Sequence, residues 1–360
     1  MTLRTPLCDL LGIEVPVLQS GMNRIAGPDL VAQVCEAGGL GILAALGLAP
    51  DTLRGQIRQV RALTRRPFGV NLWLVEPGNA LPGDDALRGA QKQLDVFRSR
   101  LGAPAKSALP AVPPLNVPQN IEVILEERVP VFSTALGDPG AEIVSRCHSR
   151  GVKVVSMVAS IDEALQVERS GVDAVVAQGF EAGGHRSSWT GSEPVGLFAL
   201  VPRVVDAIKA PVIASGGIGD GRGFAAALAL GAQGVLLGTR FLATRESAAP
   251  EFWKKAVQAG RESSLTKVLT GLPARAMRNA FVREYEASGA PVLPPFMQRA
   301  AAQDVYDAAT ARGDGELAAL FAGQSAGLIH DLPGAGEVVR ALAAEAEAAL
   351  RRAMSATGSR

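Results

Sequence analysis

Apolar positions along this chain follow two patterns, short continuous runs and longer stretches with helical spacing. The short runs, rich in valine and isoleucine, predict buried strands at residues 15–19, 40–44, 68–72, 129–133, 152–157, 172–177, 211–215 and 234–238. Helical spacing between these runs predicts helices at residues 28–37, 51–63, 140–149, 161–170, around 200–205 and 224–230, with Asp51 as the N-cap of the second helix. Strands that alternate with helices in this way indicate a parallel sheet.

Eight strand–helix units favour a closed barrel over an open sheet. A glycine recurs where a helix gives way to the next strand, as at Gly151, Gly171 and Gly231. We therefore predict an α/β fold, a (β/α)8 TIM barrel built from residues 1–244 and 311–360, with an insertion at about 76–119 and a short helix at about 90–98 within it. Residues 245–310 have a helical pattern without a strand run and predict a helical cap. A last helix is expected at 334–354.

Composition excludes several classes of protein. The chain has 360 residues, of which 48% are hydrophobic and 20% charged, enough for one large core. A net charge of +1 and an aromatic content of 4% argue against a nucleic-acid partner, and no run approaches the roughly 18 apolar residues of a membrane span. We therefore expect a cytoplasmic protein without a membrane partner. The three cysteines lie far apart and no cluster has metal-ligand spacing, so neither disulfides nor a metal site is predicted.

Two glycine-rich turns follow the last two predicted strands. Ser215-Gly216-Gly217 ends the seventh strand, and Leu237-Gly238-Thr239 ends the eighth. Glycine lets the backbone approach a ligand closely, and the N-terminus of the helix that begins near Arg222 suits an anion. Barrel enzymes often bind phosphate beyond these two strands. The pattern predicts a phosphate-bearing ligand there, although the same glycines also suit plain tight turns.

His185 follows the sixth predicted strand, directly after Gly183 and Gly184. Histidine titrates near neutral pH, and the carboxyl ends of barrel strands carry the chemistry of such enzymes. We interpret His185 as the proton-transfer residue, although a lone histidine is also commonly structural. The charged residues at 254–255 and 275–283 are instead expected on solvated helix faces.

Further polar or small residues at the strand ends are candidates for the same ligand. The amides of Asn71 and Gln178 suit the ring or phosphate chain of a cofactor and suit loop backbone equally well. Gly21-Met22 follows the first strand and offers backbone and a thioether to a planar ring. Gln324-Ser325 lies in a small polar segment, which predicts either a loop that reaches the ligand or a turn between helices.

Four phrases give the chain a family resemblance, namely AQGFEAGGHR, PVIASGGIGDGRG, ALALGAQGVLLGTRFL and AGQSAGL. With them the chain resembles the nitronate monooxygenase family, formerly called 2-nitropropane dioxygenases, over about residues 7–342, and the last two favour its bacterial class I members. The resemblance implies an FMN-dependent TIM barrel with a helical substrate domain. It implies FMN contacts at Asn71, Gln178, Gly183, Gly217 and the segment from Leu236 to Thr239, and a catalytic His185 near the flavin N5. Ser187-Ser188-Trp189 departs from the glycine that commonly follows His-Arg in that family.

The first hypothesis is therefore an FMN-dependent monooxygenase that oxidises alkyl nitronates, such as propionate 3-nitronate, with O2 to a carbonyl product and nitrite. Its partners are a small anionic substrate and O2. The second is an FMN-dependent NAD(P)H:quinone or enoyl-acyl-carrier-protein reductase, because the resemblance extends to these enzymes. They have the same barrel and a phrase very similar to EAGGH. The third is a barrel that binds a phosphorylated ligand without redox chemistry. A homodimer is possible, since the sequence does not set the oligomeric state.

Overall fold

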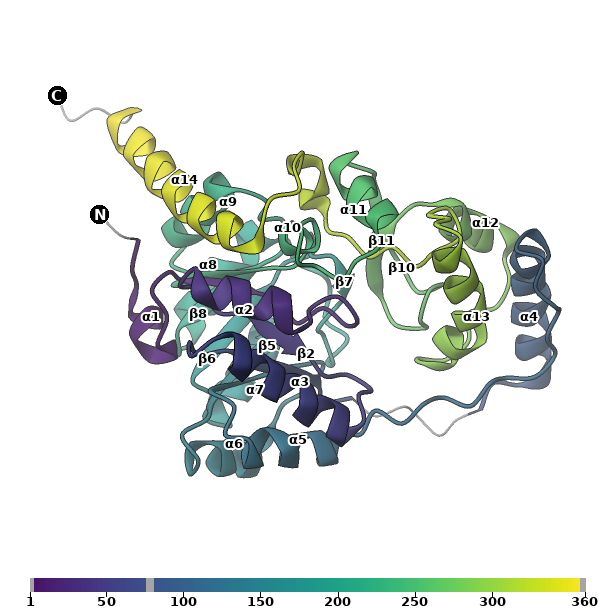
Figure 1. Cartoon of the computed structure of the whole chain (residues 1–360), viewed down its shortest axis with the longest axis horizontal. Helices are drawn as coiled ribbons and strands as arrows, with labels where there is room; N and C mark the ends of the chain where they lie inside the picture. The colour runs from purple at the N-terminus through teal and green to yellow at the C-terminus, as the bar shows by residue number, and fades with distance from the viewer. Residues whose placement is uncertain (1–2, 76–80, 357–360) are drawn as a thin grey trace.

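Eight parallel strands form the centre of the molecule (Figure 1). The computed structural model describes residues 3–75 and 81–356. The strands are β1 (Val17–Gln19), β2 (Ile42–Ala44), β3 (Gly69–Trp73), β4 (Val131–Ala135), β5 (Lys153–Val158), β6 (Ala174–Gln178), β8 (Val212–Ser215) and β9 (Gly234–Leu237). Leu40, just before β2, donates to Val17 O at 3.0 Å and accepts from Gln19 N at 2.9 Å, which joins the two edges of the sheet. The predicted (β/α)8 barrel is confirmed.

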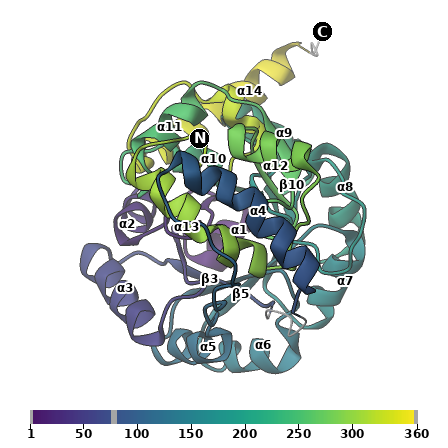
Figure 2. The ribbon, with the colours of Figure 1, turned by 90° about the vertical axis from the view of Figure 1, so that its right-hand side faces the viewer.

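Helices surround the strands in a ring, as Figure 2 shows. They are α2 (Pro28–Glu36), α3 (Pro50–Leu63), α5 (Val117–Glu126), α6 (Gly140–His148), α7 (Ile161–Arg169), α8 (Leu197–Ala207), α9 (Gly221–Ala229) and α14 (Ala335–Ala356). Seven of the eight match predicted helices to within a few residues, with α8 longer than expected, whereas α5 was not predicted. Asp51 was wrong as an N-cap, because Ala49 takes that position and Asp51 lies in the first turn of α3. The short α1 (Pro6–Leu11) packs its buried leucines against the inward-facing side chains of the barrel.

A second lobe, made of α4 (Asp84–Arg100), α11 (Glu251–Gln258), α12 (Ala280–Ser288), α13 (Met297–Ala311), β10 (Ser263–Thr266) and β11 (Ala274–Met277), lies at one end of the barrel (Figures 1 and 2). It has its own core, in which the rings of Phe97, Phe281, Tyr285 and Tyr306 contact one another. The helix predicted at about 90–98 is therefore real and longer, and it belongs to this lobe. The start of the predicted insertion, residues 76–80, lies outside the described residues.

The prediction that residues 245–310 contain no strand was wrong. β10 pairs antiparallel with β11, and β11 pairs antiparallel with β7 (Gly184–His185), the residues that follow β6. Neither β10 nor β11 carries an apolar run, so their pairing depends on the tertiary contact. The expected solvated faces were also wrong at Lys254 and Arg275, which are both buried. Arg275 donates to Phe180 O from Nε at 3.2 Å and from Nη2 at 3.0 Å, and so ties the second lobe to the loop after β6.

Within the described residues, no helix is long and apolar enough to cross a membrane. The cytoplasmic location stays a prediction, as do the division into domains and the homodimer. All three cysteines are free and buried. Buried free cysteines pack as small apolar side chains.

Candidate active site

A cavity of about 800 Å³ lies between the carboxyl ends of the strands and the second lobe. Nearly all the residues predicted to hold a cofactor line it, namely Gly21, Met22, Asn71, Gln178, Gly183, Gly184, His185, Ser215, Gly216, Gly217, Leu236, Leu237, Gly238, Thr239 and Ser325. Gln324 is the exception, because its side chain is exposed on the short helix η1 (Gln324–Leu328) and only its backbone N–H is used, donating to Glu181 O at 3.0 Å.

The glycines after β8 form a turn that other residues adopt poorly. Gly216 has φ +105° and Gly217 has φ +72°, the left-handed region that glycine tolerates best. In the part of the chain that the structure describes, no residue accepts a hydrogen bond from the backbone N–H of Gly216, Gly217 or Thr239. Thr239 heads the short helix α10 (Thr239–Leu242), and its hydroxyl accepts from Gly323 N at 2.9 Å. This wall of the cavity thus has several backbone donors to offer an anion.

The expectation that α9 aims its N-terminus at that anion was wrong. Carboxylates already occupy its first N–H groups. Asp220 accepts from Arg222 N at 2.9 Å and from Gly223 N at 3.3 Å, while Glu345 accepts from Gly221 N at 2.9 Å. A second anion there would meet Asp220 and Glu345, and the first N–H groups of α9 already have partners, so this helix end does not offer an anion site.

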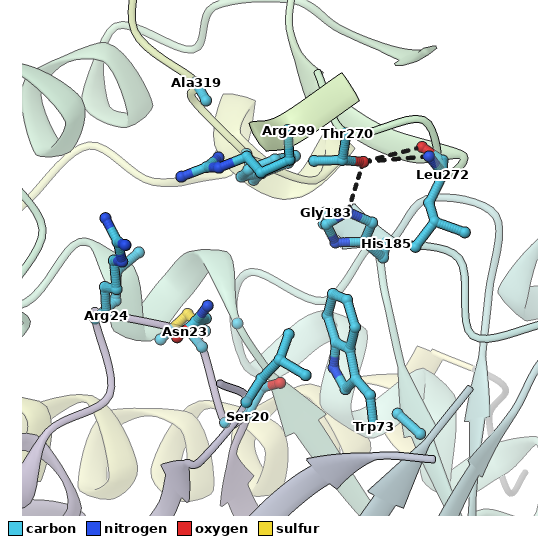
Figure 3. A pocket seen from close by; sticks show the side chains of 18 of the residues that line it. Ser20, Asn23, Arg24, Trp73, Gly183, His185, Thr270, Leu272, Arg299 and Ala319 are labelled. Carbon is cyan, nitrogen blue, oxygen red and sulfur yellow. Dashed lines mark hydrogen bonds between the residues drawn. The ribbon is translucent and has the colours of Figure 1, made fainter. Parts of the chain in front are cut away.

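His185 lies in the cavity wall on β7 (Figure 3). Its Nε2 is 2.9 Å from Thr270 Oγ1, and its ring contacts those of Trp73 and Phe321 at centroid distances of 4.7 and 5.3 Å. Thr270 Oγ1 in turn donates to Leu272 O at 3.3 Å. Because that bond uses the only hydroxyl hydrogen, the arrangement favours the histidine tautomer that carries hydrogen on Nε2 and leaves Nδ1 as the basic atom.

Burial lowers the pKa of His185 to about 3, and the positive charge of Arg299 acts in the same direction. His185 is therefore a neutral imidazole at physiological pH. A neutral ring can exchange a proton with a substrate, but it brings no positive charge to an anionic one. Charge stabilisation in this cavity must come from other groups.

Both polar atoms of the Gln178 amide bind the backbone of the segment that carries His185. Its Nε2 donates to His185 O at 3.0 Å and its Oε1 accepts from Ser187 N at 2.8 Å. Asn71 donates from Nδ2 to Ser133 Oγ at 3.0 Å, and no described residue donates to its Oδ1. Of the two roles that the sequence left open, Gln178 therefore holds the loop that carries His185, while Asn71 keeps one amide atom for a ligand in the cavity.

The segment after His185 is held by a buried carboxylate on α7. Glu163 is fully buried, and its Oε1 accepts from Ser188 Oγ at 2.8 Å, Trp189 N at 3.0 Å and Thr190 N at 3.1 Å. Its Oε2 accepts from Ala159 N at 2.8 Å. The Ser-Ser-Trp departure noted in the sequence thus has a structural role at this anchor, and of its three residues Ser187 lines the cavity.

Several cavity-lining residues escaped the sequence analysis, among them Arg24, Thr270 and Arg299. Thr270 and Arg299 belong to the region interpreted only as a helical cap, where no motif marks a functional residue. The one sequence signal that could have marked Arg299 is its charge at the start of the alanine run at residues 300–302. Figure 3 shows Arg24 on the loop after β1 and Arg299 reaching from the second lobe toward the same part of the cavity.

Comparison with known proteins agrees with this geometry. The family model described as nitronate monooxygenase matches residues 4–345. The chain belongs to the nitronate monooxygenase family. It is therefore an oxidoreductase, and the resemblance drawn from the sequence is confirmed. The nitronate monooxygenase of Pseudomonas aeruginosa is 39% identical over 345 residues, which cover 93% of this chain and 97% of that protein.

Two solved structures have a fold similar to that of this nitronate monooxygenase family member. Nitroalkane oxidase from Streptomyces ansochromogenes has a TM-score of 0.87 and 36% identity, covering 97% of this chain and 99% of that one. FabK from Thermotoga maritima has a TM-score of 0.78 and 34% identity, covering 98% and 99%. Both likenesses span the barrel and the second lobe together.

Proposed function

We propose that this protein is an FMN-dependent nitronate monooxygenase, which oxidises alkyl nitronates such as propionate 3-nitronate with O2 to a carbonyl compound and nitrite. One observation carries the proposal. A single cavity brings together unpaired backbone donors, an amide with a free acceptor atom and a neutral histidine. The family and the nitroalkane oxidase neighbour support the reaction class.

The residues present fit FMN. The N–H groups of Gly216, Gly217 and Thr239 suit its phosphate, because backbone donors in a glycine turn can surround an anion without a side chain in the way. No protein atom fills the space beside Gly238 Cα, since a Cβ there would have Met22 Sδ at 3.7 Å as its nearest neighbour. Asn71 Oδ1 can accept from a ring N–H. Met22 would pack against the ring.

Bound FMN supplies the electron transfer between the nitronate and O2. The protein's own residues bind the substrate, orient it and manage its protons. A nitronate has already lost its α-proton, so the weakly basic imidazole of His185 need not remove one. His185 can instead donate or accept a hydrogen bond at the reacting atoms, held in place by Thr270. Trp73 and Phe321 pack around it and keep water away.

Oxygen uptake tests the proposal. Purified FMN-loaded protein is mixed with propionate 3-nitronate in an oxygen electrode, with free FMN as the control. Uptake above the control, with nitrite formed in proportion, is the expected result. Uptake equal to the control removes the proposed function.

The reductase alternative is tested by the same preparation, and the likeness to FabK makes the test necessary. NADH or NADPH is added without oxygen while the flavin absorbance is followed. An unchanged spectrum is expected from a monooxygenase of nitronates. Rapid bleaching would favour the reductase, and a protein that stays colourless with FMN would favour a phosphate-binding barrel without redox chemistry.

A further inference from the structure

Arg299 is a cation in the cavity wall that no carboxylate neutralises among residues 3–75 and 81–356. Its Nε donates to Gln303 Oε1 at 2.7 Å, and its guanidinium lies 5.0 Å from the ring centroid of Tyr306. These contacts hold the side chain without satisfying its two terminal nitrogens. The outer edge of the guanidinium thus stays available to a ligand.

Arginines that serve structure in this fold have protein partners on their terminal nitrogens, backbone carbonyls for Arg275 and, beside α13, mainly carboxylates for Arg98. Arg98 is fully buried, and it pairs with Asp95 at 2.6 Å and with Asp304 at 2.9 Å. It also donates to Gln91 and to a backbone carbonyl. Arg299 has no such partners, although burial lowers its pKa and makes an unpaired charge costly. That contrast indicates a ligand-binding role.

Arg24 adds a second positive group, on the loop after β1 (Figure 3). Its backbone has φ +61°, a conformation that is strained for a residue other than glycine. Its Nη1 is 3.9 Å from Asp307 Oδ1, an exposed pair that contributes little, and Asp307 also lies within electrostatic reach of Arg299. The two arginines and Asp307 together carry a formal charge of +1.

We propose that Arg299 binds a carboxylate at the end of the substrate remote from its nitronate, and so selects acid-bearing nitronates over simple alkyl nitronates. The free edge of a guanidinium presents two parallel N–H groups, which match the two oxygens of a carboxylate. One excess charge fits a monoanion better than a phosphate dianion. The reacting end lies at His185, where the aromatic walls of Trp73 and Phe321 offer no charge.

The inference rests on the proposed function, so its first test measures binding alone. Succinate resembles propionate 3-nitronate, with a carboxylate in place of the nitronate, and it does not react. Succinamide has the same length and carries no carboxylate. Calorimetry with FMN-loaded protein is expected to show tighter binding of succinate than of succinamide. In Arg299→Met the succinate Kd rises about 10- to 150-fold and the succinamide Kd stays constant.

Two further variants control this result. Arg312→Met removes an exposed arginine at the end of α13 that does not line the cavity, and it should leave both constants unchanged. Arg299→Lys keeps the positive charge but lacks the two parallel N–H groups of a guanidinium. Its succinate affinity should therefore lie between those of the wild type and Arg299→Met. Flavin content and melting temperature show that each variant is folded. Equal binding of succinate and succinamide by the wild type would overturn the inference.

Kinetics give the second test. Arg299→Met should raise the KM for propionate 3-nitronate by a similar factor and raise the KM for propyl 1-nitronate, which has no carboxylate, much less. Equal effects on both substrates would show that Arg299 is not selective for the carboxylate. If the wild type oxidises neither nitronate, the proposed function fails, and the succinate experiment still decides the role of Arg299.

Discussion

Gly238 offers the sharpest test of where the flavin binds. It has φ −103° and ψ −69°, which alanine adopts without strain. The added methyl would have only Met22 Sδ at 3.7 Å and Ser20 Cβ at 3.9 Å within reach, both at ordinary contact distance. All three residues line the cavity. Gly238→Ala therefore fits the protein alone and intrudes only on a ligand.

The expected size of the effect follows from that geometry. One extra methyl group in a well-packed site costs about 1–3 kcal/mol. Because each 1.4 kcal/mol is about tenfold in affinity, the FMN Kd should rise about 5- to 150-fold. The free energy of unfolding of the flavin-free protein should change by less than about 0.5 kcal/mol, since no protein contact is lost.

Fluorescence titration of flavin-free protein with FMN measures the first quantity, and denaturant unfolding measures the second. Gly55→Ala is a matched control, because Gly55 is exposed on α3 and a Cβ there has no neighbour within 4 Å. It should stabilise the helix by about 1 kcal/mol and leave FMN binding unchanged. Wild-type FMN affinity in Gly238→Ala would refute the placement of the flavin beside this turn.

Three further predictions concern His185 and its support. In His185→Asn, FMN should stay bound while turnover of neutral nitroalkanes, which must lose a proton, falls by about 10²–10⁴-fold in an oxygen electrode. The folded pKa of His185, about 3, lies below the unfolded value of 6.5, so the unfolded chain binds more protons between these pH values. Stability is thus lost as pH falls below 6.5, by about 2 kcal/mol at pH 5, and His185→Asn should unfold with a shallower pH dependence in urea titrations of flavin-free protein. Glu163→Gln replaces an acceptor that serves several donors and should cost about 1–3 kcal/mol in the same assay, whereas an unchanged midpoint would show that the carboxylate does not hold the loop.

Local sequence patterns were enough to predict the barrel and the side of the cavity that the strand ends form. A run of valine or isoleucine followed by glycine specifies a buried strand and its stop, and parallel strands place their carboxyl ends on one face. The glycine turn at Gly216 and the position of His185 follow from those two facts. The family resemblance then supplied the cofactor and reaction class as expectations.

Contacts between distant segments decided the rest. β11 is a strand because β7 lies beside it, and the N-terminus of α9 is closed to phosphate because Glu345, 124 residues further on, accepts from Gly221. The same holds for Arg299, whose role depends on the absence of a partner in its final surroundings. Strand and turn propensity act between near neighbours in the chain, whereas the partner of a charge or of a strand edge exists only after the second lobe has packed onto the barrel.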